Sequence, residues 1–356
     1  MTEFLSRLTN FGSALPSVVS LGLIWGIMAI GLYITYKVLE LSDLTVDGSF
    51  CTGCAVCIVM MSMGYPTWLG MLCAFIAGLL AGAVTGFLHT VCKIPAILSG
   101  ILTQLGLWTV NMIIMGMQMS HESGIWVGFE KVLDGESGAT VVMNKYIKIG
   151  ELVSTLTIPA RNSKPLVSAL YLTKALDGSK PFFLYPPLVM LLITVVVIIA
   201  LYWFFGTERG ASIRATGANE HMARAQGINT NVNKLIGLML ANGLVALSGS
   251  LFAQFNGNAE INMGRGAIVI GLAAIIIGDV LFSKIFKNFA MKLAAVSIGA
   301  IIYYIVIQAV LTLLKVDSQY LKLMSAVIVA IFLTVPNLKR HHKKKTKKAE
   351  VATCSR

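Results

Sequence analysis

The chain has 356 residues, of which 56% are hydrophobic and only 12% are charged, and its mean hydropathy is +0.79. This composition lies far outside that of soluble globular proteins and predicts an all-α polytopic membrane protein in contact with the lipid bilayer. The formal net charge of +12 does not indicate a nucleic-acid partner, because the basic residues gather in loops between apolar runs and in the tail Lys339 to Lys348.

A hydrocarbon core of about 30 Å needs about 20 apolar residues per helix, and the chain offers about nine such runs. The first is long enough to remain as a span, and the charged residues before it do not form a cleavable signal. Two runs are short and interrupted by glycine. The predicted spans are Leu15–Tyr36, Val46–Met63, Pro66–His89, Ala96–Met117, Tyr185–Phe205, Leu235–Phe255, Ala267–Phe282, Met291–Leu314 and Tyr320–Pro336.

These spans divide the chain into six parts. Residues 1–117 hold the first four helices, 118–183 form a polar insert, 184–206 hold the fifth helix, 207–233 form a polar loop, 234–337 hold the last four helices, and 338–356 form a basic tail. The insert has the length of a docking platform for a partner, and a flexible insert is the alternative.

Lysines and arginines in the short loops predict the orientation, because such residues are retained in the cytoplasm. They fall on alternate sides of successive spans, which makes the C-terminus cytoplasmic. An odd number of spans then puts the N-terminus and the insert 118–183 outside, unless Val46–Met63 is re-entrant. The basic tail is expected to tether anionic lipid, and its adjacent His341 and His342 have no third ligand nearby that would make a metal site.

The spacing of Cys51, Cys54 and Cys57 would indicate an iron–sulfur cluster in a soluble chain. Here they open an apolar run, and no further cysteine follows at the usual spacing. We interpret them as small residues that pack between helices. Gly78, Gly82 and Gly86 recur every four residues and predict a bare helix face that a neighbouring helix approaches closely.

Asp43 and Asp47 open the second predicted span in the stretch Asp43 to Phe50. We favour a position at the cytoplasmic interface, where both would be hydrated and would cap a helix. The alternative is a helix break that lines a translocation pathway, since discontinuous helices place backbone groups at such pathways. Asp279 falls near the cytoplasmic end of the seventh span and is expected to be an interface residue.

Polar side chains within spans must find partners or face water. Gln104, Trp108 and Asn111 share one face of the fourth span by the rule of three to four residues. These and the other polar span residues have two alternative roles: they line the translocation pathway, or they form hydrogen bonds between helices. The pathway candidates are Asp47, Ser49, Gln104, Trp108, Asn111, Asn242, Gln254 and Asn256.

The loop between the fifth and sixth spans is polar and has the signals of two short helices separated by Gly217. Asn219 can cap the second, which has Glu220 near its start and Arg224 near its end, as the helix dipole favours. Gly227 should stop it.

The loop resembles that of the membrane permease subunits of ABC importers of the branched-chain amino acid and ribose type. The resemblance rests on Arg209, Gly210, Ile213, Arg214, Ala215, Gly217, Asn219, Glu220, Ala223, Arg224, Gly227, Ile228, Asn229, Val232 and the small-residue helix Gly243 to Gly249. The stretches Asp43 to Phe50 and Ile275 to Phe282 look most like the tryptophan and tyrosine permease branch. The segment Gln118 to Phe183 lies outside the resemblance.

The resemblance implies a type II importer bundle in the cell membrane of bacterial type, working as a homodimer or beside a similar permease. An extracytoplasmic lipoprotein would deliver the solute, and an ABC ATPase would carry ATP and Mg²⁺, so that this chain binds no cofactor itself. The loop would couple to that ATPase through Glu208, Arg209, Gly210, Arg214, Gly217, Asn219, Glu220, Ala223, Arg224 and Gly227. The branch implies that the solute is an amino acid. Its resemblance to tryptophan and tyrosine permeases further implies an aromatic one.

The motif search agrees with a transport subunit that is not itself an enzyme. The chain has no G-x-x-x-x-G-K-[ST], no nucleophile elbow and no H-E-x-x-H. Three alternatives stay open: a secondary transporter or channel driven by an ion gradient, an ABC permease for a sugar, and an ABC permease for a nucleoside.

Overall fold

The computed structural model describes residues 2–116, 127–128, 131–132, 141–142, 145–146, 155–157, 186–282, 286, 288–314 and 330. Eight helices coincide with the first eight predicted spans, although the first begins earlier than predicted. They are α1 (Thr2–Tyr33), α2 (Val46–Ser62), α3 (Thr67–Thr90), α4 (Ala96–Gly116), α6 (Pro186–Gly206), α9 (Thr230–Asn256), α10 (Ala267–Phe282) and α11 (Phe289–Leu314). Apart from Ala330, the predicted ninth span and the basic tail lie outside the described residues.

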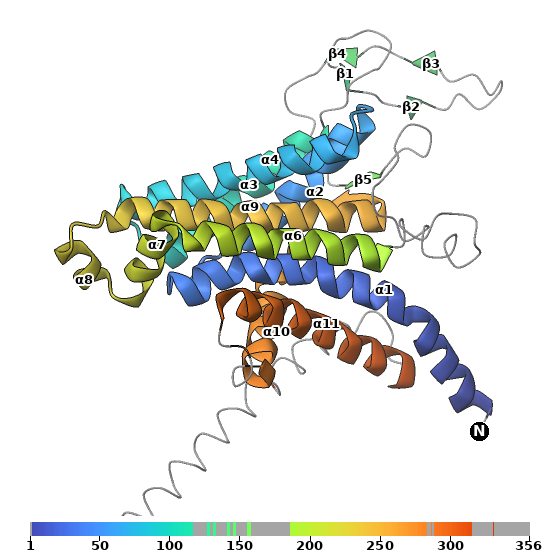
Figure 1. Ribbon diagram of the computed structural model, residues 1–356. Helices are drawn as coiled ribbons and strands as arrows, with labels where there is room; N and C mark the ends of the chain where they lie inside the picture. The colour runs from blue at the N-terminus through green and yellow to red at the C-terminus, as the bar shows by residue number, and fades with distance from the viewer. Residues whose placement is uncertain are drawn as a thin grey trace, which may run out of the picture.

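Six helices in the described part of the chain are long and apolar enough to cross a membrane, whereas α2 and α10 are shorter. Helix α1 packs against both α9 and α6, and the three helices run along the length of the bundle (Figure 1). Most residues on α4 and α6 that face outward are apolar, as expected for helices in contact with lipid.

The glycine stripe of α3 packs against α9, as predicted. A side chain at Gly78 would collide with the carbonyl of Asn242, and one at Gly82 would collide with the carbonyl of Leu238. At Gly86 the nearest atom would be Cδ1 of Leu235, at 2.5 Å. Bare glycine surfaces therefore bring the two backbones together, which is how helices associate without a hydrophobic driving force in lipid.

The path from α1 to α2 is broken. A π-helical turn, η1 (Ile34–Val38), ends the first helix, and an extended segment leads to Val46. Ser49 Oγ donates to Oδ1 of Asn242 at 2.7 Å, and Asn242 lies midway along α9. The short helix α2 therefore begins level with the middle of its neighbours rather than at an end of the bundle.

The path from α9 to α10 is broken in a similar way. Gly257, at φ +79°, ends α9, and strand β6 (Asn258–Glu260) pairs antiparallel with β5 (Thr155–Thr157). The chain then returns inward, so that Gly264 lies against the backbone of Asp47 near the start of α2. Helix α10 begins there, at half depth, as α2 does.

The two broken paths are arranged as an inverted pair. Helix α1 is antiparallel to α9, with Ser248 bonded to the carbonyl of Ile24 and Gly31 against the carbonyl of Ala241. Each long helix is followed by a break, a short helix and another long helix. Inverted repeats with discontinuous helices that meet at half depth are a known architecture of membrane transporters.

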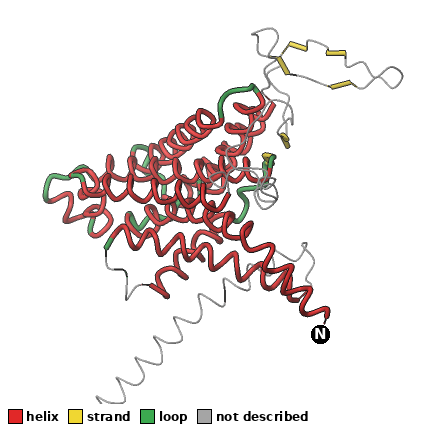
Figure 2. Tube along the Cα trace, turned by 45° about the vertical axis from the view of Figure 1, so that its right-hand side comes forward, coloured by secondary structure: helices red, strands yellow, loops and turns green. Residues whose placement is uncertain are grey.

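The ends of the bundle carry different structures. Helices α7 (Glu208–Ala218) and α8 (Glu220–Ala225) project at one end, whereas strands β1 (Val127–Gly128), β2 (Lys131–Val132), β3 (Val141–Val142), β4 (Lys145–Tyr146) and β5 lie at the other (Figures 1 and 2). The N-terminus lies at the end opposite α7 and α8. This placement agrees with the expected sides of the loops, while the side of the membrane itself stays a prediction.

The three clustered cysteines lie in α2 and are buried free thiols. Cys54 donates to the carbonyl of Gly249 at 3.1 Å, and Cys51 donates to the carbonyl of Glu260 at 3.5 Å. They pack α2 against α9 and β6, as the packing interpretation expects.

Candidate functional site

Helices α7 and α8 each follow a residue whose type favours helix capping, and the side chain of that residue caps the helix. Thr207 Oγ1 accepts from the amide of Gly210 at 3.3 Å, and Asn219 Oδ1 accepts from the amide of Met222 at 3.0 Å. Gly227, at φ +78°, ends the second helix as predicted. The capped pair is a defined structure rather than a solvated loop.

The prediction that Gly217 separates the two helices is wrong. Helix α7 continues through Gly217, and the junction is Asn219 in extended conformation at φ −160° and ψ 105°. A side chain at Gly217 would collide with the carbonyl of Val38. This glycine is therefore needed for contact between α7 and η1, a role that sequence alone does not distinguish from a helix break.

Glu220 holds α8 on α9. Its carboxylate accepts from Arg224 Nη2 at 2.6 Å and from Lys234 Nζ at 2.7 Å, and Thr230 Oγ1 lies at 3.3 Å. The hydrogen bond from Lys234 is the main cause that lowers the pKa of Glu220 below its usual value, so the carboxylate stays charged at neutral pH. Two predicted coupling residues, Glu220 and Arg224, are thus engaged within the chain.

The other predicted coupling residues divide by exposure. Gly210 and Ala223 are buried, which lets the helices pack closely. Glu208, Arg209 and Arg214 are exposed and form no ion pair within the described residues. Their side chains are free to meet a partner at the projecting end of the bundle.

Asp43 is 4% exposed and lies inside the bundle. It accepts from the amide of Thr45 at 2.9 Å and from Nδ2 of Asn242 at 2.7 Å. The favoured interpretation of a hydrated aspartate at the cytoplasmic interface is therefore wrong, because the chain turns back after η1 and carries this carboxylate to the middle of α9. Asp43 does not cap α2 either: the residue before that helix is Thr45, which has no side-chain cap, and the bond from the Thr45 amide to Asp43 closes a local turn.

Asp47 joins the two short helices. Its two carboxylate oxygens accept from the amides of Gly266 and Ile268, both at 3.1 Å. It thus caps the start of α10 from the first turn of α2, across about 220 positions of sequence. The negative charge is also favoured by the dipole of α10.

A cavity of about 300 Å³ opens beside this junction. It contains four of the predicted pathway residues together with residues that were not predicted. Its lining is Asp47, Gly48, Cys51, Gln104, Leu105, Trp108, Asn111, Ile261 and Arg265. We call it the junction cavity.

The remaining pathway candidates lie elsewhere. Ser49 and Asn242 belong to the buried cluster around Asp43. Gln254 is buried and donates to Cys57 Sγ at 3.4 Å, and Asn256 is exposed at the end of α9. The structure therefore does not bring these four side chains into the junction cavity.

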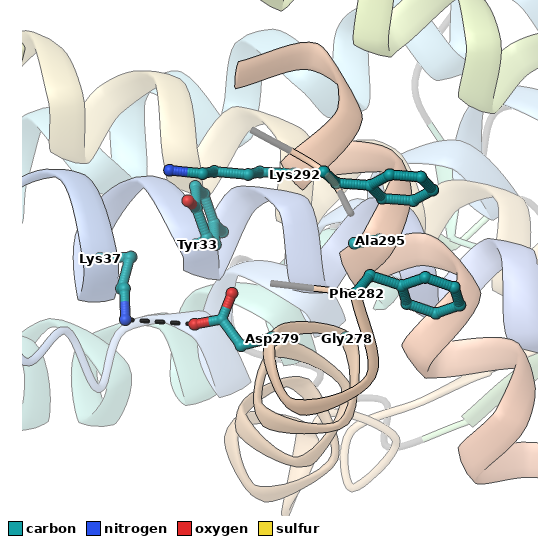
Figure 3. A pocket seen from close by; sticks show the side chains of 8 residues that line it. Tyr33, Lys37, Gly278, Asp279, Phe282, Lys292 and Ala295 are labelled. Atoms are coloured by element: carbon teal, nitrogen blue, oxygen red, sulfur yellow. Dashed lines mark ion pairs between the residues drawn. The ribbon is translucent and has the colours of Figure 1, made fainter. Parts of the chain in front are cut away.

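A second cavity, of about 220 Å³, lies nearer the end that carries α7 and α8. We call it the ion-pair cavity, because Lys37 Nζ of η1 lies 3.1 Å from the carboxylate of Asp279 on α10 (Figure 3). Its lining is Tyr33, Lys37, Gly278, Asp279, Phe282, Phe286, Lys292 and Ala295. Asp279 has 36% of its side-chain surface accessible, and its place at the membrane interface stays a prediction.

Sequence reasoning missed Arg265 and the pairing of Lys37. Arg265 lies between Gly264, whose Cβ would collide with the backbone carbonyl of Asp47, and Gly266, at φ +88°. Two glycines around one arginine signal a constrained turn. That signal was available, but nothing local in the sequence says what the turn approaches.

The fold and the two discontinuous helices define an integral membrane protein of the transporter class. The chain belongs to the family of the branched-chain amino acid transport system permease component, whose model matches residues 15–335. It is therefore a transport subunit of the ABC permease type.

Known relatives support the same class. A tyrosine transport system permease protein of Clostridioides difficile is 33% identical over 92% of this chain and 92% of its own length. A ribose import permease protein of Escherichia coli is 29% identical over 40% of this chain and 42% of its own length. A nucleoside ABC transporter permease protein of Lactococcus lactis is 29% identical over 37% and 38%. No solved structure matches the chain.

Proposed function

We propose that this chain is the transmembrane subunit of an ABC importer for an amino acid, working as a homodimer in the bacterial cell membrane. A binding lipoprotein outside would deliver the solute, and a separate ATPase would dock on α7 and α8 and hydrolyse ATP with Mg²⁺. The observation that carries the proposal is the placement of α7 directly against η1, at the break between α1 and α2, with α8 held on α9 by Glu220. Similarity to the tyrosine permease over almost the whole chain favours an amino acid over a sugar or nucleoside.

The contacts suggest how movement of the ATPase would reach the pathway. Gly217 of α7 meets the carbonyl of Val38, and Leu39 packs against Gly237 of α9. Pulling on α7 would therefore move η1 and the segment that leads to α2. Because Lys37 of η1 is paired with Asp279, the same movement would reach α10. Movement of α7 would therefore displace both discontinuous helices, as in shear between packed helices.

The test uses Arg209 and Arg214 of α7, which are exposed and form no ion pair with any residue that the structure describes. Arg209→Glu with Arg214→Glu should abolish co-purification with the cognate ABC ATPase and stimulation of its hydrolysis, because both docking charges are reversed. Lys93→Glu is the matched control, since Lys93 is an exposed cation in the loop after α3 and outside α7 and α8. Normal stimulation of hydrolysis by the double variant would remove this face of α7 from the docking surface.

Glu220 supplies a second arm of the test. Glu220→Ala removes the acceptor shared by Arg224 and Lys234, so α8 should loosen from α9 while the spans stay folded. We expect the ATPase to bind but to drive uptake several-fold less well. Uptake equal to that of the unaltered chain would show that α8 transmits no movement.

An ion-driven transporter is a second candidate, because two carboxylates, Asp43 and Asp47, lie at half depth in the bundle. Both, however, accept hydrogen bonds that hold backbone segments in place. Uptake into vesicles that contain only this chain, driven by a proton or sodium gradient, would favour that candidate and exclude the ABC proposal.

A further inference from the structure

The junction cavity has a distinctive chemistry that the proposed function does not by itself explain. Arg265 is an exposed cation at its wall, and its guanidinium makes no hydrogen bond or ion pair within the described residues. The carboxylate of Asp47 lies in the same lining but is more than 4 Å from Arg265, since no ion pair joins them. The cavity thus presents a positive and a negative group that do not neutralise each other.

Asn111 supplies an unused acceptor. It is 1% exposed, it lines the cavity, and its Oδ1 has no hydrogen-bond partner in the described part of the chain. Its Nδ2 donates to the carbonyl of Gly48 at 3.3 Å, so turning the amide over would only place two oxygens together. The thiol of Cys51 lies within hydrogen-bonding range of the Asn111 side chain, but its proton is donated to the carbonyl of Glu260 at 3.5 Å. A buried acceptor without a donor is costly and points to a missing partner.

The turn that carries Arg265 is built into the fold. Gly264 touches the backbone of Asp47, and Gly266 both adopts a positive φ and donates to the Asp47 carboxylate. These contacts fix Arg265 beside the start of α2. Opposite, Trp108 of α4 is 45% exposed and gives an aromatic surface to the same cavity.

We propose that the junction cavity is a binding station for a zwitterionic amino acid with an aromatic side chain. Arg265 pairs with the α-carboxylate through its guanidinium fork. Asn111 Oδ1 accepts from the α-ammonium, which also lies in the field of Asp47. Trp108 packs against the aromatic ring. The assignment rests on the proposed function, because it concerns the solute that the importer passes.

The arrangement favours this ligand class over the alternatives. A neutral sugar could accept hydrogen bonds from Arg265 but carries no negative charge to pair with it, whereas the carboxylate of an amino acid supplies both. A cavity of about 300 Å³ is at the small end of ligand sites, which suits a single amino acid. Binding should be weak, because a transport station must also release its solute.

The test measures ligand contact on the purified full chain in nanodiscs by saturation-transfer NMR, which detects weak binding. The probes are L-tyrosine, L-tryptophan, tyramine, which lacks the carboxylate, and 3-(4-hydroxyphenyl)propanoate, which lacks the ammonium. We expect both amino acids to bind at least about tenfold more tightly than either analogue, since each analogue loses one charged contact. Equal binding of all four probes, or no binding of the amino acids, would overturn the proposal.

Reversing the charge at position 265 should increase the affinity for one probe, and a misfolded protein would not show such an increase. In Arg265→Glu the affinity for L-tyrosine should fall by about tenfold or more, because the new carboxylate repels the carboxylate of the ligand. The affinity for tyramine should rise above that of the unaltered chain, because the same carboxylate attracts the ammonium. Arg265→Lys should retain part of the affinity for L-tyrosine. The control is Asn262→Ala, an exposed neighbour in the same turn, which should bind all four probes as the unaltered chain does.

Transport with the ATPase separates the two proposals. If the assembled importer moves L-tyrosine and Arg265→Gln moves it at the same rate with the same KM, the binding station is wrong while the importer stands. If ATPase stimulation is normal in Arg265→Gln but uptake falls about tenfold, both proposals are supported. If the unaltered chain moves L-tyrosine without any ATPase, the importer proposal fails even where the NMR pattern agrees with the station.

Discussion

The two cavities contain the same kinds of charge in opposite arrangements. In the ion-pair cavity, Lys37 and Asp279 lie 3.1 Å apart and pair, while Lys292 of the same lining is exposed and has no ion-pair partner among the described residues. In the junction cavity, Asp47 is engaged by backbone amides at the start of α10, and the guanidinium of Arg265 has no partner among the residues that the structure describes. In the ion-pair cavity an acid and a base join two elements of the protein, whereas in the junction cavity the acid caps a helix and the base is left available to a third molecule.

The difference comes from what fixes each charge. Asp47 is held by the backbone of another element, and Arg265 by a turn of two constrained glycines. Lys37 and Asp279 are half-exposed side chains on helix ends, with 52% and 36% of their side-chain surface accessible. Disturbing the junction should therefore cost much more stability than disturbing the ion pair.

The largest effect is expected at Gly264. In Gly264→Ala the new Cβ would collide with the backbone carbonyl of Asp47, and two backbones must separate. We expect a loss of about 3 kcal/mol in the free energy of unfolding, or failure to accumulate in the membrane. Thermal unfolding followed by a thiol-reactive dye measures it, because Cys51, Cys54 and Cys57 are buried in the folded chain.

Gly106→Ala is the matched control. Gly106 lies in α4, and a Cβ there would meet nothing within 4 Å. Alanine is the better helix former, so this variant should be as stable as the unaltered chain or slightly more stable. Equal behaviour of the two variants would show that the approach of Gly264 to Asp47 does not hold the junction.

A smaller loss is expected at Asp47. Asp47→Ala leaves the amides of Gly266 and Ile268 without their acceptor, which should cost about 1–2 kcal/mol, as loss of a helix cap does. Asp47→Asn keeps one acceptor oxygen and should lose about half as much. The same unfolding assay measures both. An alanine variant no less stable than the asparagine variant would mean that the cap carries no stability.

Local patterns predicted much of the fold but not these junctions. Spans, helix caps at Asn219 and the glycine stripe from Gly78 all depend on residues close in sequence, where apolar length, capping geometry and periodicity apply directly. The turn-back after η1 leaves no such signal. An aspartate before an apolar run has the same local pattern whether it lies at an interface or, as Asp43 does, inside the bundle.

The site was predicted in part for the same reason. Gln104, Trp108 and Asn111 share a helix face, so their common place in the junction cavity follows from helical periodicity. Arg265 comes from the other inverted half of the bundle, and only tertiary structure brings it to that face. Gly217 was misinterpreted because a glycine required by close approach and a glycine that ends a helix are the same letter in a sequence.

The smallest effect is expected at the ion pair. Lys37→Asp should weaken folding by no more than about 1 kcal/mol, because both partners are half-exposed and screened by solvent and salt. The double variant Lys37→Asp, Asp279→Lys should recover most of that loss, since it restores opposite charges at the same two positions. The stability of the unaltered chain, the single variant and the double variant is measured by unfolding in about 0.05 M and about 0.5 M salt. At high salt the three should have nearly equal stability, because salt screens the charges. If the single variant instead costs as much as Gly264→Ala, the two cavities are stabilised alike, and the contrast between a pair that joins elements and charges held apart for a ligand no longer holds.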